Sequence, residues 1–354
     1  MELGLMLAGG GGLRVPDMVA LGRRAEIAGF DGVYVPESWR SGFVPVAALA
    51  AATTTVKVGP YVLNAHARTP LAAGMSAIDL DQLSGGRLVL GIGSGNHVMN
   101  ETGHGVPVVR PLAKMRDYLE VLRRVTAAPI GTSVSFAGEL HSIAGWKPQA
   151  SPVRDSMPVL LAATAPRMME LAADAADGIA LGALQFIEFV ADIASRSRQR
   201  SPLGTGFTVY CAAMVSVHPD REVARLRARR SVVDLFAVKP HPHYELLLRL
   251  QGYDEFATGL LKGIASQGPA SAAAEVPDEV VDALTIAGTP AECAAQIARF
   301  DGVVDALILV NVATMQQVAE AGLGSVPARA ELLASYDGFF ELAQVVRDGV
   351  VHVA

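Results

Sequence analysis

The chain alternates short apolar runs of β-strand character with longer segments of helical periodicity. Strands that alternate with helices along a chain predict a parallel sheet covered by helices. We expect eight strands, at residues 3–7, 32–36, 57–63, 87–92, 158–162, 178–181, 206–217 and 305–310. Eight strand-helix units are most simply arranged as a (β/α)8 barrel, an α/β fold whose active site lies at the carboxyl ends of the strands.

Proline and glycine mark the expected helix ends. Pro70 and Pro166 stand where helices should begin, and Gly29 and Gly85 stand where helices should end. The segment from about 219 to 286 has helical patterns, and we expect it to be a helical insertion before the last β/α unit. No repeat or low-complexity linker divides the chain, so residues 1–354 are predicted to form one domain.

The expected insertion carries a cluster of arginines: Arg225, Arg227, Arg229 and Arg230. Two interpretations remain open for it. A charged helix of this kind usually presents a solvated face. Alternatively, one of the arginines reaches an anionic ligand.

Composition excludes several classes of protein. The 354 residues are 51% hydrophobic and 18% charged, unlike a disordered chain. A net charge of -6 gives no basic field for nucleic acid. The apolar runs fall short of the roughly 18–20 residues that span a membrane, and Glu2 stands where a signal peptide needs positive charge. Cys211 and Cys293 fit no metal or redox spacing. We expect a cytoplasmic protein with a small-molecule substrate.

A glycine-rich loop follows the fourth expected strand, with the sequence Gly91-Ile-Gly93-Ser-Gly95. Glycines here let the backbone approach a ligand closely. The spacing matches neither a Walker loop nor a dinucleotide fingerprint. The loop of S-adenosylmethionine-dependent methyltransferases is an alternative, but residues 88–94 lack the acidic residue that it expects.

The segment 158–166 ends a strand in small residues and opens a helix at Pro166. Free backbone N–H groups and the positive end of the helix dipole would then form a phosphate cradle. The alternative is an ordinary helix start capped by the hydroxyl of Thr164.

Polar residues at the strand ends are the catalytic candidates. His66, after the third strand, is either an acid/base or a residue that shapes the site. His97, Glu101 and His104 could suggest a metal, but their spacing means little in a glycine-rich loop, so no metal site is expected.

Three motifs together closely resemble the luciferase-like monooxygenase superfamily, and within it the branch that uses the deazaflavin coenzyme F420. They are Val62-Leu-Asn64, Arg68-Thr-Pro70, and the stretch 79–93 that contains Ser-Gly-Gly-Arg and Gly-Ile-Gly. Segments 158–178 and 286–292 are similar to later parts of the same family, so the resemblance covers nearly the whole chain. Its nearest forms are methylenetetrahydromethanopterin reductase and F420-dependent dehydrogenases.

The resemblance implies a barrel with a β-bulge and a non-prolyl cis peptide bond at Tyr61-Val62. It also implies cofactor contacts at Tyr61, Val62, Asn64, Ser94, Gly95, Asn96, Ala162, Ala163, Thr164 and Ala165. Coenzyme F420 is the expected cofactor, with flavin mononucleotide (FMN) as the alternative. Of the 29 basic residues 24 are arginine, a composition expected of actinobacteria, where F420 is common. Family habit implies a homodimer.

The chain departs from the family pattern at two positions. Glu37-Ser38 replaces the usual Asp-His, and His66 replaces the proline of Asn-x-Pro. We therefore expect Glu37, with a pKa raised if it is partly buried, and His66 to act as acid or base. Alternatively, the Glu37 carboxylate only accepts hydrogen bonds from the cofactor or the backbone. Trp39 and His97 are expected to line the substrate pocket, although Trp39 could instead be a core residue.

The expected reaction is hydride transfer between C5 of the deazaflavin and a small organic substrate. An FMN-dependent monooxygenase and a non-catalytic deazaflavin-binding protein are the alternatives.

Overall fold

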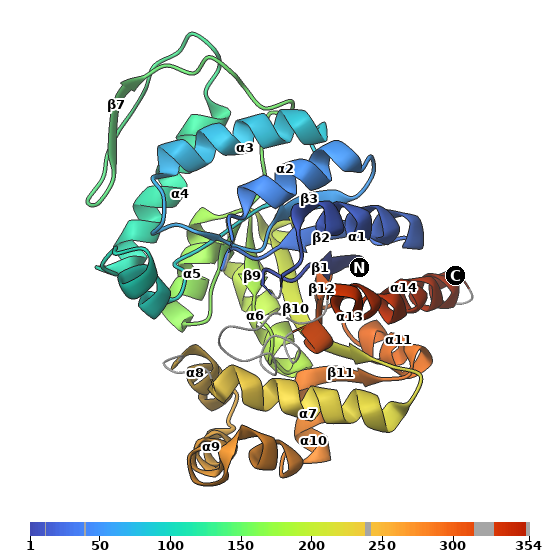
Figure 1. Ribbon diagram of the computed structural model, residues 1–354. Helices are drawn as coiled ribbons and strands as arrows, with labels where there is room; N and C mark the ends of the chain where they lie inside the picture. Colours follow the sequence, from blue (N-terminus) through green and yellow to red (C-terminus); the bar gives the residue numbers. More distant parts are fainter. Residues whose placement is uncertain (11, 39, 238–241, 315–328, 352–354) are drawn as a thin grey trace. The chain divides into compact units, whose positions relative to one another are not determined.

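The computed structural model describes all residues of the chain except 11, 39, 238–241, 315–328 and 352–354 (Figure 1). The chain divides into two compact units. The first unit comprises residues 1–33, 181–195 and 209–354, and the second comprises residues 34–180 and 196–208.

Parallel strands form the centre of the first unit. They are β1 (Glu2–Met6), β10 (Thr208–Val217), β11 (Thr285–Gly288) and β12 (Ala306–Asn311). Strand β12 pairs with β1 and with β10, and β10 also pairs with β11. Residues 210–215 of β10 face β12, whereas residues 214–217 face β11. Strand β10 is therefore long because its last residues pair with β11, a strand that the sequence analysis did not predict.

Helices surround these strands (Figure 1). They are α1 (Val15–Ala28), α6 (Ile187–Arg200), α7 (Arg221–Ala237), α8 (Pro242–Leu250), α9 (Asp254–Ala274), α10 (Asp278–Leu284), α11 (Pro290–Ala298), α13 (Arg329–Ala334) and α14 (Asp337–Val351). Helices α7 to α10 occupy the segment for which the sequence predicts a helical insertion. Helix α7 packs against α9, and Val232, Phe236 and Leu260 belong to their shared apolar core.

The arginine cluster of α7 makes ion pairs within the first unit. Arg225 is buried and pairs with Asp278 and with Asp282 at 2.6 Å. Arg229 also pairs with Asp278. These contacts attach α7 to α10, so at these positions the cluster is neither a plain solvated face nor a free anion site.

The second unit also contains parallel strands, with helices and one hairpin. Its elements are β2 (Gly32–Val35), α2 (Phe43–Ala52), β3 (Lys57–Pro60), β4 (Leu63–Asn64), α3 (Pro70–Ser84), β5 (Leu90–Gly93), the π-helical turn η1 (Met99–Gly103), α4 (Pro111–Ala127), β6 (Val134–Ala137), β7 (Ser142–Trp146), β8 (Val159–Ala162), α5 (Pro166–Ala175), β9 (Gly178–Leu181) and the short 3-10 turn η2 (Gly204–Gly206). Strands β4, β5, β8 and β9 pair in that order. The antiparallel β6–β7 hairpin extends beyond α3 and α4 (Figure 1).

The third expected strand is interrupted. The sequence predicts one strand over 57–63, but the structure has β3 and β4 separated at Tyr61 and Val62. Pro60, the last residue of β3, has no backbone N–H to donate to a neighbouring strand, whereas the N–H of Tyr61 still donates to the carbonyl of Val35 at 2.9 Å. The peptide bond between Tyr61 and Val62 is cis, at the position that the family resemblance implies.

Glycine and arginine in the stretch 84–87 fix the ends of two helices. Helix α3 ends at Ser84 and is followed by Gly85, whose φ of 63° is a conformation that glycine adopts without steric cost. Two residues later, the guanidinium of Arg87 donates to the carbonyls of Ala50 and Thr53 at 2.9 Å each. Since these carbonyls lie at the end of α2, Arg87 satisfies acceptors that the helix itself leaves open.

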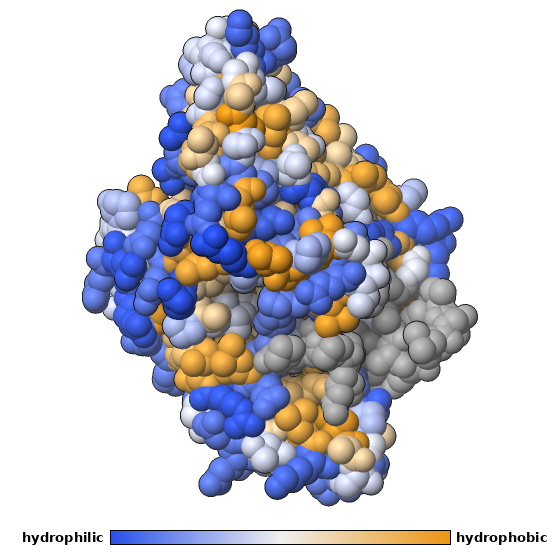
Figure 2. Space-filling view, turned by 90° about the vertical axis from the view of Figure 1, so that its left-hand side faces the viewer, coloured by the Kyte–Doolittle hydropathy of each residue, from blue (hydrophilic) through white to orange (hydrophobic). Residues whose placement is uncertain are grey.

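The apolar composition of the chain is accounted for by buried side chains. Mean hydropathy is +0.34, and the apolar residues of both units form extensive cores. In the part of the chain that the structure describes, no helix has both the length and the apolar character needed to span a membrane. On the face shown in Figure 2, hydrophobic residues occur as separate patches among hydrophilic ones.

Candidate active site

Three segments of the second unit meet where β5 and β8 end and where the chain passes from β3 to β4. A Cβ atom added at Gly93 would lie 2.8 Å from Cγ2 of Val62 and 3.1 Å from Cβ of Ala162. Such distances leave no room for a side chain, so only glycine lets the end of β5 approach the residue before β4 and the end of β8 in this way. The structure therefore brings Val62, Gly93 and Ala162 together, two of which the sequence analysis assigns to the cofactor site.

The loop after β5 is tied to β4 by two asparagines. Asn64 donates from Nδ2 to Oδ1 of Asn100 at 2.6 Å, and Asn100 donates to the carbonyl of Ser94 at 2.9 Å. Gly95 has a φ of 66°, and a Cβ at this position would lie 2.6 Å from Oδ1 of Asn64. Asn100 is fully buried, and sequence reasoning missed it because no motif marks it.

The remaining candidates from the same loop are placed differently. Oδ1 of Asn96 accepts from the backbone N–H of Val98 at 2.8 Å and so supports the start of η1. His97 is exposed, and Trp39 lies outside the described residues. Among the described residues, no group of three metal-binding side chains is close enough to hold a metal ion.

The prediction of a raised pKa for Glu37 is wrong. Its carboxylate pairs with Arg68 through both oxygens, and it accepts backbone N–H bonds from Gly42 at 3.0 Å and Asn64 at 2.8 Å. Burial alone would raise the pKa of Glu37, but the hydrogen bonds and charge of Arg68 and the two backbone donors outweigh it, so the pKa is lowered. Glu37 is therefore ionised near neutral pH and has little capacity to act as an acid.

Arg68 is the partner that sequence reasoning did not assign. Its guanidinium lies 5.1 Å from the centre of the Phe43 ring as well as against Glu37. Because Arg68 belongs to the Arg-Thr-Pro motif, the sequence indicated that this residue matters. It did not indicate that Arg68 would contact Glu37, 31 positions earlier.

The start of α5 lacks a side-chain cap. Ala165 is the N-cap residue, and the backbone N–H groups of Met168 and Met169 bond to its carbonyl. The alternative in which Thr164 caps this helix is therefore wrong. Ala162, Ala163 and Thr164 lead from β8 to this helix start, whose positive dipole end favours an anion.

His66 is buried at the end of the third strand region. Its backbone N–H donates to Oδ1 of Asn64 at 3.0 Å, and its Nδ1 lies 3.2 Å from Nζ of Lys114 in α4. Burial, followed by the nearby charges of Lys114, His97 and His141, lowers the pKa of His66 to about 4. The imidazole is therefore neutral near pH 7.

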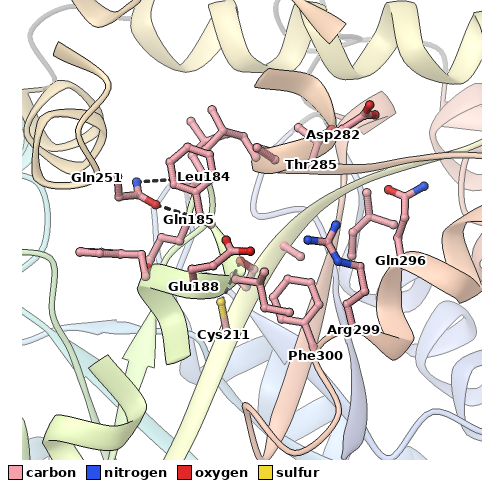
Figure 3. Close-up of a pocket in the computed structure, with 18 of the residues that line it drawn as sticks. Leu184, Gln185, Glu188, Cys211, Gln251, Asp282, Thr285, Gln296, Arg299 and Phe300 are labelled. Carbon is pink, nitrogen blue, oxygen red and sulfur yellow. Dashed lines mark hydrogen bonds between the residues drawn. The ribbon is translucent and has the colours of Figure 1, made fainter. Parts of the chain in front are cut away.

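A separate pocket of about 700 Å³ lies in the first unit (Figure 3). It is lined by residues 184–189 and by parts of β10, α10, β11 and α11. The side chain of Gln251 accepts from the backbone N–H of Phe186 at 2.7 Å and donates to the carbonyl of Leu184 at 3.1 Å, which fixes one wall (Figure 3). No residue that the sequence analysis assigns to catalysis or to the cofactor lines this pocket, so it does not define the candidate site.

Residues 1–306 match the family model described as luciferase-like monooxygenase, and the chain belongs to this family. The family resemblance inferred from the motifs is thus confirmed. The 5,10-methylenetetrahydromethanopterin reductase of Archaeoglobus fulgidus is 31% identical over 280 residues, which cover 75% of this chain and 80% of the relative. A Mycobacterium tuberculosis protein named "Putative coenzyme F420-dependent oxidoreductase" is 29% identical over 345 residues, covering 90% and 97% of the two chains.

Comparison with solved structures confirms the predicted fold class. The F420-dependent tetrahydromethanopterin reductase of Methanopyrus kandleri superposes with a TM-score of 0.75 at 20% identity, covering 98% of this chain and 99% of that one. An F420-dependent secondary alcohol dehydrogenase gives a TM-score of 0.71 at 17% identity, covering 98% and 99%. The fold is the (β/α)8 barrel of the luciferase-like family.

Proposed function

We propose that the protein is an oxidoreductase that uses coenzyme F420 and transfers a hydride to or from a small organic substrate. The single observation that carries this proposal is the meeting of Val62, between β3 and β4, with Gly93 and Ala162 at the ends of β5 and β8, close in sequence to a helix start without a side-chain cap. Curated relatives whose names state F420-dependent oxidoreduction or methylenetetrahydromethanopterin reduction support it.

The residues present fit a cofactor with a phosphate and a flat ring system. Glycine at position 93 and alanines at 162, 163 and 165 leave the backbone unshielded by large side chains. The first turn of α5 offers backbone N–H groups without a competing hydroxyl cap, which suits an anionic group. We assign the phosphate end to residues 162–165 and the ring to Tyr61, Val62, Asn64 and residues 94–96.

When bound, the deazaflavin supplies the carbon that donates or accepts the hydride. The protein's own part is binding and orientation. Glu37 and Arg68 hold the loops after β2 and β4, because Glu37 accepts the backbone N–H of Asn64. Asn64 and Asn100 hold the loop after β5. His66, neutral and buried, is the polar group that we assign to the substrate.

Absorbance of the coenzyme tests the proposed activity. The protein is incubated with reduced F420 and a panel of ketones, enones and imines under strict exclusion of oxygen. One class of substrate should increase the rate at which reduced F420 is reoxidised. A non-catalytic binding protein would leave the redox state unchanged with every substrate. An FMN-dependent monooxygenase would instead require FMN and molecular oxygen, and either result contradicts the proposal.

A further inference from the structure

A lysine and a histidine side chain face each other in the candidate site. Nζ of Lys114, near the start of α4, lies 3.2 Å from Nδ1 of His66. His66 has only 4% of its surface exposed, and its Nε2 is buried without a hydrogen-bond partner among the described residues. In the described part of the chain, Lys114 makes no ion pair with a carboxylate, so its positive charge is not neutralised locally.

The chemistry of lysine determines which nitrogen of His66 carries the proton. A lysine ammonium has three donors and no acceptor, so the ring nitrogen that faces it must be the acceptor. Nδ1 is therefore unprotonated, and the proton of the neutral imidazole resides on Nε2. A buried N–H without a partner is costly, which is the state expected of a donor whose acceptor arrives with a ligand.

We propose that Lys114 is a positioning residue that holds His66 as the Nε2–H tautomer, and that this N–H donates a hydrogen bond to a carboxylate or carbonyl oxygen of the substrate. The geometry makes His66 a donor to oxygen rather than the acid or base predicted from sequence. The role in turnover rests on the proposed F420-dependent function, whereas the tautomer and the oxygen preference do not.

The charged and titratable groups around His66 indicate which kind of ligand group it would bind. The ammonium group of Lys114 approaches from α4, while His97, in the loop after β5, and His141, just before β7, are further groups whose charge would lower the pKa of His66. The carboxylate of Glu37 is already paired with Arg68. Positive potential together with an unpaired donor favours an oxygen acceptor and disfavours an ammonium group.

Nitrogen-15 NMR of protein with selectively labelled histidine tests the tautomer without coenzyme or substrate. His66 is assigned by its loss in the His66→Gln variant. Nδ1 should resonate as an unprotonated ring nitrogen and Nε2 as a protonated one. In Lys114→Met the tautomers should mix and the pKa of His66 should rise by about one pH unit, because a positive neighbour is lost.

Two further variants separate this role from a purely structural one. Lys114→Arg keeps a donor with no acceptor and should restore the wild-type tautomer. Lys147→Met removes an exposed lysine of the same unit and should leave His66 unchanged. A protonated Nδ1 in the wild-type protein, or an unchanged His66 in folded Lys114→Met, would overturn the proposal.

Acetate and acetamidinium test the ligand preference, since they share a planar shape and have opposite charge. Acetate should shift the Nε2 resonance of His66 in a saturable manner, and acetamidinium should not. A response to acetamidinium alone, or to neither probe, would overturn the assignment of an oxygen acceptor. Because F420 is absent, failure here is distinct from failure to bind the coenzyme.

Discussion

Glu37 and Arg68 face each other as a two-pronged ion pair, in which both carboxylate oxygens also accept a backbone N–H. The pair connects the loop after β2 to β4, shortly after the cis peptide bond, because one of those backbone donors is Asn64. The carboxylate that the sequence marks as an acid is thus part of the framework that orders the strand ends.

Glu37→Gln tests this framework role. Removing the charge leaves Arg68 partly buried and unpaired, so the free energy of unfolding should fall by about 2–4 kcal/mol. The pKa of Glu37 is lowered in the folded state, so its contribution is present above the ordinary carboxyl pKa and is lost as pH falls through the lowered value. The variant should therefore lose part of the acid sensitivity of the wild-type protein in chemical denaturation measured as a function of pH.

Glu139→Gln is the matched control for this measurement. Glu139 forms an exposed ion pair with Arg110, and removal of such a pair should change the free energy of unfolding by no more than about 1 kcal/mol. Equal effects of the two substitutions would show that the Glu37 pair has no special role.

His66→Gln should change the acid stability of the protein. The pKa of His66 is lowered to about 4, so between roughly pH 6.5 and 4 the unfolded chain binds a proton that the folded protein does not. Stability should therefore fall as pH drops through this window, and the fall should be shallower in the variant. Thermal unfolding at a series of pH values measures this slope. An unaltered slope would mean that His66 takes up its proton in the folded state as readily as in the unfolded chain.

Thr164→Asp tests the assigned phosphate position. A negative charge beside the start of α5 should repel the coenzyme phosphate and weaken F420 binding at least tenfold, as the Kd from fluorescence titration. Thr164→Asn introduces a side chain of nearly the same shape as Asp but without the charge, so it should bind F420 almost as tightly as the wild-type protein. Since Thr164 does not cap the helix, both variants should unfold close to the wild-type temperature. Equal F420 affinities of the two variants would show that the coenzyme phosphate does not bind beside Thr164.

Gly93→Ala tests the close approach of Gly93 to Val62 and Ala162. The new methyl group would meet Val62 and Ala162 at distances that force a shift. Overpacking of this kind costs about 1–3 kcal/mol, and displacement of Val62 should weaken F420 binding as well. Gly182→Ala is a suitable control, because a Cβ there has no heavy atom within 4 Å. Wild-type affinity in Gly93→Ala would show that this contact does not shape the cofactor site.

The positions of the strand ends could be predicted because parallel strands share one edge at which their carboxyl ends meet. Val62, Gly93 and Ala162 follow apolar runs that are plain in the sequence, and glycine and alanine there indicate close backbone approach. Helix boundaries at Pro70, Gly85 and Pro166 followed from the backbone preferences of these residues in the same way.

The electrostatic state of the site could not be predicted, because it depends on partners that are distant in the chain. The sequence shows Glu37 but not its contact with Arg68. The predicted direction of the Glu37 pKa shift was therefore wrong. Lys114 and Asn100 follow no motif, and they reach the site only through the packing of α4 and η1. The extra strand β11 was missed for a similar reason, since its four residues pair only with residues 214–217 at the carboxyl-terminal end of β10.

Direct titration of the purified protein with coenzyme F420 and, separately, with FMN tests the central claim most directly. Fluorescence should report saturable binding of F420 at a Kd at least tenfold lower than that of FMN, and Thr164→Asp should weaken the F420 curve selectively. Preference for FMN, or binding of neither compound by folded protein, would contradict the assignment of this chain as an F420-dependent oxidoreductase.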